Sequence, residues 1–195
     1  MSRTPDADLM SRVQEGDHEA FAGLVDRHKD AVFGYLCRLT GCRDRAEELA
    51  QDTFLRLYQS ASRYRENGQL KAYLFRIATN LVRSEARRNE RRRLLGGVFS
   101  SQPERVNGFA HAAASESSPH EDMVRIELSE KLATAISSLP VRYRIPLVLH
   151  DVEEWSYNEI ARSTGSKEGT IKSRISRGRR LLRDKLDPLR NGAHR

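Results

Sequence analysis

The feature that most constrains the fold is a break in the apolar pattern between Gly96 and about Asp122. Gly, Ser, Ala, Asn and Pro dominate this segment, and no helical or strand-like period of apolar residues survives in it. A segment of this composition buries too little apolar surface to offset the entropy lost on ordering, so residues 96–122 are predicted to form a flexible linker. The linker leaves two short blocks, residues 1–95 and 123–190, and each has room for only one small core.

Both blocks have the apolar spacing of α-helices. Apolar residues recur three and four positions apart, and no Val-, Ile- or Thr-rich run alternates with polar residues as a strand would. The spacing predicts helices over residues 8–14, 17–40, 44–60 and 70–93, and a second helical block from about Met123 to Leu189. We therefore expect an all-α protein: two small helical domains joined by a flexible linker, with a short tail at residues 191–195.

The charge of the chain is unevenly distributed. The net charge is +7 and the isoelectric point is near 9.7. Arginines gather at the end of the first block and in the second block, whereas Glu104, Glu116, Glu121 and Asp122 make the linker acidic. Basic patches of this kind indicate a polyanionic partner, most often nucleic acid.

The stretch from Ser156 to Leu182 has the spacing of a helix-turn-helix. A short helix, the turn Thr164-Gly165-Ser166 and a second, basic helix follow one another. Gly165 supplies the positive φ that such a turn needs. Ile160 and Ile171 are placed to pack the two helices together, which leaves the basic residues facing outward.

In a helix-turn-helix the second helix enters the major groove, where its first residues contact base edges. Lys and Arg suit guanine edges there, and Ser suits either base type. Arg179, Arg183 and Lys185 are expected to contact phosphates, which add affinity without sequence information. An ordinary solvated basic face is the alternative interpretation. The residues assigned to DNA contact on this helix are Lys172, Ser173, Arg174, Ser176, Arg177 and Arg180, and the predicted base readers among them are Lys172, Ser173 and Arg177.

Ordered motifs run through both blocks. The first block carries Gly16-Asp17, Ala20-Phe21, Ala46 to Leu49, Gln51 to Phe54 and Arg76 to Asn80. The second block carries Leu139-Pro140, Asp151 to Ala161 and Gly169 to Arg174. In this order the motifs resemble the second and fourth conserved regions of the extracytoplasmic-function sigma factors, the compact two-domain relatives of the sigma-70 class. Only the linker and a few residues at each end fall outside the resemblance.

The resemblance implies a regulatory subunit, not an enzyme, that binds core RNA polymerase and directs it to promoter DNA. The first domain would bind polymerase and the minus-10 element, and the second would bind the minus-35 element and the polymerase flap. The acidic face of the helix over 44–60 suits a basic protein surface better than DNA, although an ordinary solvated face is the alternative. By the family match, the polymerase contact consists of Glu48, Gln51, Asp52 and Leu55.

The minus-10 contact implied by the resemblance lies on the loop over 63–69 and the helix after it. In the family a base is flipped into a pocket at this loop, so the protein must supply hydrogen bonds and a stacking surface in return. Asn80 would bind the base edge, and Tyr64 and Tyr73 would stack, unless both tyrosines are core residues. Tyr73 stands where the family usually has Trp and Leu70 where Phe is common, so the flipped base is not predicted. The assigned residues are Arg63, Tyr64, Asn67, Tyr73, Arg76, Asn80, Arg83 and Arg87.

Two other classes of protein fit parts of the sequence. A stand-alone helix-turn-helix regulator would bind its operator without polymerase. A nuclease or recombinase would need clustered carboxylates for a metal, or a Ser or Tyr nucleophile among arginines, and His150-Asp151 has no such partner at a recognisable spacing. No cofactor or metal is expected, because Cys37 and Cys42 lack further ligands nearby and fit two small buried thiols.

The remaining expectations concern location and regulation. No run of about 18 apolar residues exists and the N-terminus lacks an apolar signal segment, so we expect a cytoplasmic protein without membrane insertion. Such factors are often held inactive by an anti-sigma factor that masks the polymerase-binding surfaces, and the resemblance implies one here. The acidic linker would pass through the polymerase near its active site.

Overall fold

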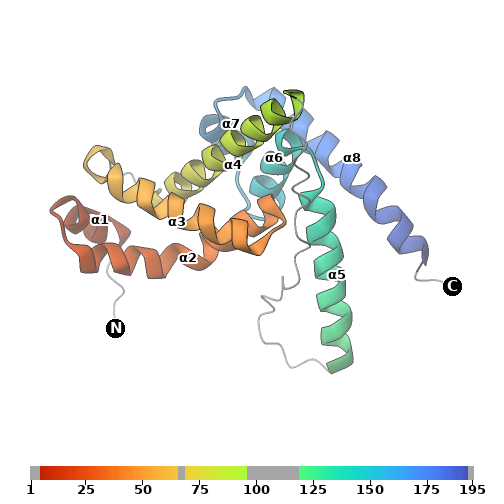
Figure 1. Ribbon diagram of the computed structural model, residues 1–195, viewed down its shortest axis with the longest axis horizontal. Helices are drawn as coiled ribbons and strands as arrows, with labels where there is room; N and C mark the ends of the chain where they lie inside the picture. The colour runs from red at the N-terminus through yellow and green to blue at the C-terminus, as the bar shows by residue number, and fades with distance from the viewer. Residues whose placement is uncertain (1–4, 66–68, 96–118, 193–195) are drawn as a thin grey trace. The chain divides into compact units, whose positions relative to one another are not determined.

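The computed structural model describes residues 5–65, 69–95 and 119–192, and in the last range it describes side chains over 128–187 (Figure 1). Over these ranges all regular structure is helical, as the sequence predicts. The chain folds as two compact units. Helices α1 and α4 and most of α2 and α3 belong to the first unit, and α5 to α8 belong to the second, which also takes in residues 37–43. None of the described helices is long and apolar enough to cross a membrane. The predicted linker lies outside the described residues, except at its end.

The first unit contains four α-helices and one short 3-10 helix. Their bounds are α1 Asp6–Gln14, α2 His18–Thr40, α3 Arg43–Gln59, η1 Ala61–Arg63 and α4 Leu70–Leu94. Gly16, at a φ of 94°, breaks the chain after α1. Asp17 then caps α2, because its Oδ1 accepts hydrogen bonds from the backbone N–H groups of Glu19 at 2.8 Å and Ala20 at 3.0 Å. Asp is among the residues most favoured at this position, because its short side chain reaches the free N–H groups of the first turn.

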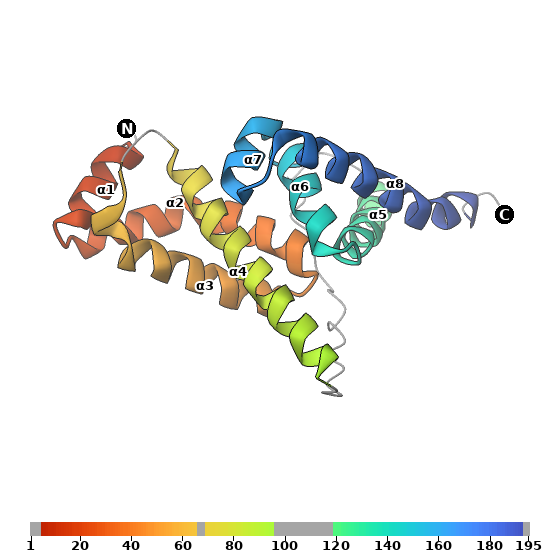
Figure 2. The ribbon, with the colours of Figure 1, turned by 90° about the horizontal axis from the view of Figure 1, so that it is seen from above.

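The core of the first unit joins α4 to α2. The Tyr35 ring of α2 stacks on the Phe75 ring of α4 with centroids 4.5 Å apart, and the Tyr35 hydroxyl lies 2.7 Å from Oγ1 of Thr79. All three side chains are fully buried, so this hydrogen bond satisfies two polar groups that would otherwise be costly to bury. Figure 2 shows α4 crossing α2 and α3. The contacts fix the rotation of α4 about its axis, and hence which of its residues face outward.

Helix α1 braces both α2 and the segment that precedes α4. The side-chain amide of Gln14 donates to the backbone carbonyl oxygens of Ala61 and Tyr64, each at 2.9 Å. At the other end of α1, the Asp6 carboxylate contacts the Arg27 guanidinium and lies 2.9 Å from Nε2 of His28. The start of the predicted minus-10 loop is therefore anchored to the N-terminal helix.

The second unit contains α5 Pro119–Ser137, α6 Val141–Asp151, α7 Tyr157–Thr164 and α8 Glu168–Gly192. Helix α5 begins at Pro119, ahead of the predicted start at about Met123. Proline suits the first turn of a helix because it has no N–H to leave unpaired there. The helix therefore extends into residues whose composition predicted a linker.

Helices α7 and α8 form the helix-turn-helix that the sequence predicts. The backbone N–H of Ser156 donates to the Glu159 carboxylate at 2.8 Å, and the Glu159 N–H donates to the Ser156 hydroxyl at 3.3 Å. This reciprocal box caps α7 at its start. Gly165 ends α7 in the left-handed conformation, at a φ of 63°. Ile160 and Ile171 have no exposed surface, which confirms their predicted role in packing the two helices together.

Helices α6 and α8 approach closely at Gly178, a residue that the sequence pattern does not single out. A β-carbon at this position would lie 3.4 Å from both the Tyr143 carbonyl oxygen and a Leu147 methyl group. Any side chain larger than a methyl group would push the two helices apart, so Gly178 sets how α8 sits on α6.

Gly165→Ala should lower the free energy of unfolding of the second unit by about 1–2 kcal/mol, because an L-residue pays that cost in the left-handed region. Space is not the reason, since a β-carbon there would meet no atom within 4 Å. Gly169→Ala is the matched control: its site is equally open but helical, so the change should stabilise by about 0.5–1 kcal/mol. Urea unfolding followed by the fluorescence of Trp155, the only tryptophan, measures both effects. Shifts of the same sign would contradict the backbone argument.

Candidate nucleic-acid interface

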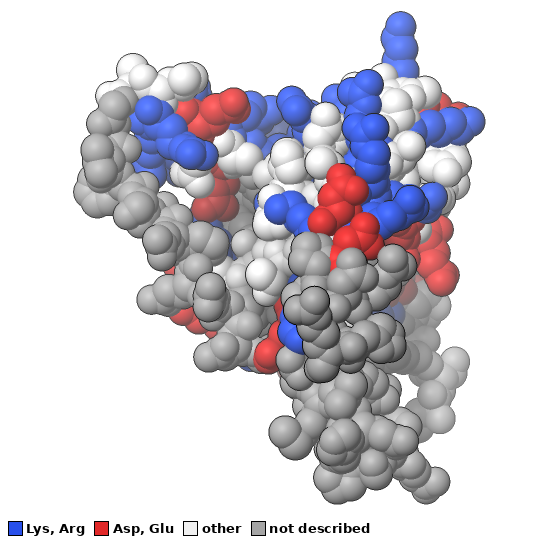
Figure 3. Space-filling model, turned by 90° about the vertical axis from the view of Figure 1, so that its right-hand side faces the viewer, with Lys and Arg blue, Asp and Glu red and all other residues white. Residues whose placement is uncertain are grey.

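The outward face of α8 is the strongest candidate for contact with DNA. Five of the six residues assigned to DNA contact on this helix are exposed: Lys172, Ser173, Ser176, Arg177 and Arg180. With about 3.6 residues per turn, these positions share one side of α8, opposite the buried Ile171 and Gly178. Figure 3 shows exposed Lys and Arg side chains with Asp and Glu side chains set among them.

The sixth residue, Arg174, is placed differently from its expected role. It is half-buried, and its guanidinium donates to the Ser166 hydroxyl at 3.2 Å. Each residue advances about 100° around the helix, which carries Arg174 away from Ser173 and toward the buried side of α8. Arg174 therefore braces the turn before α8, and the family motif alone did not reveal this position.

Two of the exposed candidates are held by neighbouring side chains. Nζ of Lys172 lies 2.8 Å from the Glu168 carboxylate and 5.4 Å from the centroid of the Tyr157 ring. The pKa of the Tyr143 side chain is lowered, chiefly because the Arg177 guanidinium lies near its hydroxyl and favours the phenolate. Side chains that are already oriented lose less rotamer entropy when they bind a partner.

A pocket of about 330 Å³ lies between the start of α7 and α8. In it, the Arg179 guanidinium is bound by the Asp151 carboxylate through two hydrogen bonds of 2.5 and 3.0 Å. An exposed ion pair adds little stability, but a bidentate one fixes the direction of the guanidinium. The pocket is lined by Tyr157, Lys172, Ile175, Ser176, Arg179, Arg180 and Arg183. It presents oriented positive charge of the kind that suits a phosphate.

A second basic stripe follows α4 in the first unit. The predicted residues on this helix recur three and four positions apart and lie on the side opposite the buried Leu74 and Ala78. The Arg76 guanidinium lies 4.9 Å from the centroid of the Tyr73 ring, whose hydroxyl is 3.0 Å from the Ser60 hydroxyl. The structure thus brings together Tyr73, Arg76, Asn80, Arg83 and Arg87.

The other predicted minus-10 residues lie near or in the loop before α4. Arg63 is exposed at the end of η1, and Asn67 lies outside the described residues. Tyr64 is only 7% exposed, and its ring packs edge-on against Tyr73 with centroids 5.0 Å apart. Leu70 is likewise buried, at 2% exposed. Tyr64 and Leu70 are therefore core residues, and the half-buried Tyr73 is the aromatic ring that the stripe presents.

The acidic face predicted on α3 is exposed. All four residues assigned to polymerase contact lie on one side of the helix: Glu48, Gln51, Asp52 and Leu55. Leu55 is 53% exposed, and Tyr58 one turn further is 37% exposed, with its ring edge-on to Phe21. Carboxylates beside exposed apolar groups are typical of a surface that binds protein. Sequence reasoning missed Tyr58, although the same spacing continues to it.

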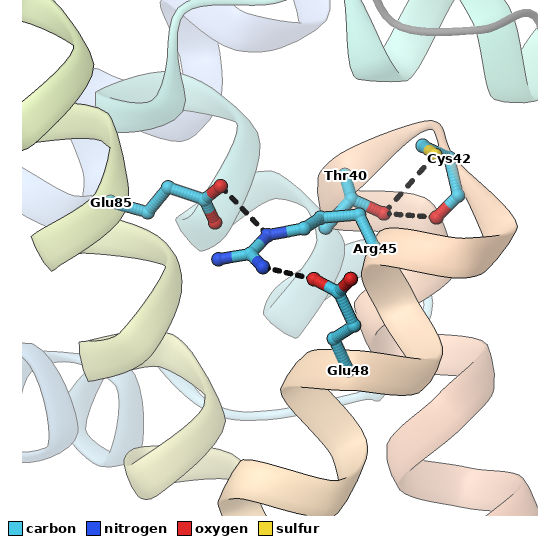
Figure 4. Close-up of polar contacts among 5 residues, drawn as sticks. All are labelled: Thr40, Cys42, Arg45, Glu48 and Glu85. Atoms are coloured by element: carbon cyan, nitrogen blue, oxygen red, sulfur yellow. Dashed lines mark hydrogen bonds and ion pairs between the residues drawn. The ribbon is translucent and has the colours of Figure 1, made fainter.

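Arg45 ties this acidic face to α4 (Figure 4). Its Nε donates to the Glu85 carboxylate of α4 at 2.8 Å, and its guanidinium also contacts the Glu48 carboxylate. Burial works to lower the pKa of Arg45, but the hydrogen bonds to Glu85 and Glu48 outweigh it, so the pKa is raised. Glu85 is 40 residues away in sequence, so no local pattern indicated this contact.

The two cysteines are free thiols. Cys37 is buried, as expected, whereas Cys42 is half-buried and its backbone N–H donates to the Thr40 hydroxyl at 3.2 Å. Among the described residues no three His, Cys, Asp or Glu side chains are grouped so that they could hold a metal ion.

Two family models match the chain: Sigma-70 region 2 over residues 24–92, and Sigma-70, region 4 over residues 129–182. The chain is 33% identical to the ECF RNA polymerase sigma factor SigW of Bacillus subtilis (strain 168), over 92% of this chain and 96% of that one. It is 30% identical to the ECF RNA polymerase sigma-E factor of Escherichia coli (strain K12), over 93% of this chain and 94% of that one. A solved structure of the sigma factor RpoE with the anti-sigma factor NepR, from Bartonella quintana, is also similar. It has a TM-score of 0.64 and 27% identity, and covers 86% of this chain and 96% of that one.

Sigma-70 regions 2 and 4 in this order define a factor that brings RNA polymerase to promoters. The chain belongs to the extracytoplasmic-function (ECF) sigma factors, the compact members of that family. It is a sigma factor that binds core RNA polymerase and recognises promoter DNA, and the reading as a stand-alone regulator is not favoured. Sigma factors act as regulatory subunits of RNA polymerase.

Asp151→Asn should tighten the binding of the sigma–polymerase complex to all promoters alike. The change releases Arg179 from its carboxylate, and one additional free cation at DNA steepens the dependence of log affinity on log salt by up to about 0.9. Filter binding over a series of salt concentrations measures this slope. Asp30→Asn, which removes the same charge from an exposed position on α2, should leave the slope unchanged. A weaker complex with Asp151→Asn would mean that the ion-paired guanidinium is the form that binds DNA.

Proposed function

We propose that residues 1–95 act as the region 2 domain, residues 123–190 as the region 4 domain, residues 96–122 as a linker between them and residues 191–195 as a tail. The extents of the two family models and the two compact units support this division. In this proposal the first domain binds polymerase and the minus-10 element and helps to melt it, and the second domain binds the minus-35 element. The factor works in the cytoplasm, where promoters and polymerase are found.

The observation that carries the proposal is the segregation of charge among exposed helix faces. Helix α3 presents carboxylates beside Leu55, whereas α4 and α8 present stripes of Arg and Lys. An acidic face is repelled by DNA and attracted by a basic protein surface, and the basic stripes have the opposite preference. The chain is therefore built for two partners of opposite charge, as a factor that joins a polymerase to DNA must be.

At the minus-35 element, α8 enters the major groove. Lys172, Ser173 and Arg177 contact base edges, while Ser176 and Arg180 extend the same face. Arg179 and Arg183 contact phosphates from the pocket beside it, which adds affinity for any sequence. Arg174 supports the turn through Ser166 and takes part only through its neighbours.

At the minus-10 element, the stripe on α4 receives the flipped base. Tyr73 supplies the stacking surface, Asn80 binds the base edge, and the arginines along the stripe bind phosphates. Arg63 and Asn67 complete the contact from the loop. Because Arg76 already lies over the Tyr73 ring, a base that stacks there displaces it or adds to the stack.

The exposed face of α3 binds core polymerase through Glu48, Gln51, Asp52 and Leu55. The same face suits an anti-sigma factor, which would mask it until transcription is needed. The solved structure of the Bartonella quintana sigma factor contains such a partner, which supports this part of the proposal. Co-purification from unstressed cells should recover a small partner that competes with core polymerase; recovery of none would count against it.

Run-off transcription with core polymerase on a promoter library tests the proposal as a whole. It should yield transcripts whose templates share two short elements, and the elements give the consensus directly. A gel shift with and without core enzyme adds a second test, because this proposal expects specific DNA binding only with core enzyme present. Tight specific binding by the isolated chain would favour the stand-alone regulator instead.

Arg177→Ala should relax selection at one position of the minus-35 element, where a good base contact is worth about 1–3 kcal/mol of discrimination. Arg183→Ala removes the same charge from a phosphate contact, so it should weaken binding to all promoters by a similar factor. Sequencing of templates selected by each variant separates the two effects. Identical selection profiles would contradict the division between base and phosphate contacts.

A further inference from the structure

An exposed ion pair lies at the start of α8. Nζ of Lys172 is 2.8 Å from the Glu168 carboxylate, and the two side chains are 56% and 45% exposed. The two residues are four positions apart, so they lie on the same side of the helix. In a helix-turn-helix the first residues of the second helix are the ones that contact base edges. The pair therefore presents a positive and a negative group together at the part of α8 that suits base contact.

The ion pair is supported by the helix before the turn. The Tyr157 ring of α7 has its centroid 5.4 Å from Nζ of Lys172, and it stacks on the His150 ring with centroids 4.5 Å apart. The His150 ring is tied in turn, because its Nδ1 lies 2.8 Å from the Trp155 carbonyl oxygen. An ammonium group that is attracted by a ring and by a carboxylate at once is restricted in position. Glu168 is therefore paired with a cation that is held in place.

Stability alone gives little reason for this ion pair, because an exposed pair of this spacing contributes little to a helix. Beside DNA the carboxylate is unfavourable, since it faces a polyanion. If Lys172 left the pair to bind a phosphate, Glu168 would remain unpaired near that phosphate. The edge of a G·C base pair in the major groove offers both partners: guanine carries acceptors that suit Lys, and cytosine carries an amino donor that suits Glu. A Lys and a Glu held side by side match these two groups.

We propose that Glu168 is a specificity-determining residue, which reads one G·C base pair of the minus-35 element together with Lys172. Lys172 donates to O6 or N7 of guanine, and Glu168 accepts from the N4 amino group of the paired cytosine. The proposal rests on the minus-35 role proposed for α8. The carboxylate repels phosphates and finds a donor only on a base edge. Glu168 therefore weakens binding to other DNA more than binding to the correct element, which is discrimination by repulsion.

The test is run-off transcription by the full chain with core RNA polymerase, on templates randomised over the minus-35 element. The wild type should select G·C at one position by about 5- to 150-fold, the range of a good base contact. Glu168→Gln should raise the selection of adenine where the wild type selects cytosine, because an amide side chain suits adenine. Glu168→Ala should lose the preference. Filter binding to random DNA should then show a salt slope steeper by up to about 0.9, as Lys172 becomes free to bind a phosphate.

Glu19→Gln is the matched control. Glu19 is also an exposed acid in the first turn of a long helix, α2, so the change removes the same charge from the same kind of position. Its selection profile and salt slope should match those of the wild type, and circular dichroism should show all variants as helical as the wild type.

An unchanged selection profile for Glu168→Gln, or an equal loss at every position, overturns the proposal. Arg177→Ala keeps this proposal distinct from the minus-35 role of α8. If Arg177→Ala changes selection at its own position while Glu168→Gln changes none, only the role of Glu168 fails. If neither variant changes selection, the minus-35 role of α8 fails with it.

Discussion

The packing of α4 against α2 governs the first unit. Tyr35 both stacks on Phe75 and hydrogen-bonds Thr79, so it fixes α4 in rotation as well as in position. A helix turned by one residue moves every side chain by about 100°, which would carry Asn80 out of the stripe and replace it with apolar residues. One buried aromatic contact thus decides which side of α4 faces outward. The proposed minus-10 stripe is the part of α4 that this core contact leaves outside.

In the second unit, a turn fixes which residues of the DNA-contacting helix α8 face outward. Gly165 reverses the chain at a positive φ, and the buried isoleucines lock α7 against α8, so the outward residues of α8 are set by the inward ones. Gly178 then lets α8 lie close on α6, which brings Asp151 within reach of Arg179. The orientation of Arg179, the candidate phosphate-binding residue, therefore depends on Gly178.

Local signals predicted most of the fold and part of the site. The cap at Asp17, the turn at Gly165 and the apolar stripes each depend on residues within one or two turns of each other, and sequence spacing shows these directly. Contacts between distant segments leave no such trace. The links from Arg45 to Glu85 and from Asp151 to Arg179, and the burial of Tyr64 under its contacts with Tyr73, all join residues that spacing cannot relate. The same limit explains Arg174, whose hydrogen bond to Ser166 depends on how the turn folds back.

The shared guanidinium of Arg45 has a thermodynamic consequence. It bonds one carboxylate on the α3 face and another on α4, so the electrostatic state of each helix contributes to the energy of the other. A partner that binds the Glu48 carboxylate leaves Arg45 paired with Glu85 alone. A ligand that shifts α4 weakens the contact between Arg45 and Glu85, and thereby strengthens the hold of Arg45 on Glu48. Coupling of this kind is reciprocal: if one ligand changes the affinity for a second ligand by some factor, the second changes the affinity for the first by the same factor. Under the proposed roles of α3 and α4, assembly with polymerase and capture of the promoter belong to one linked equilibrium.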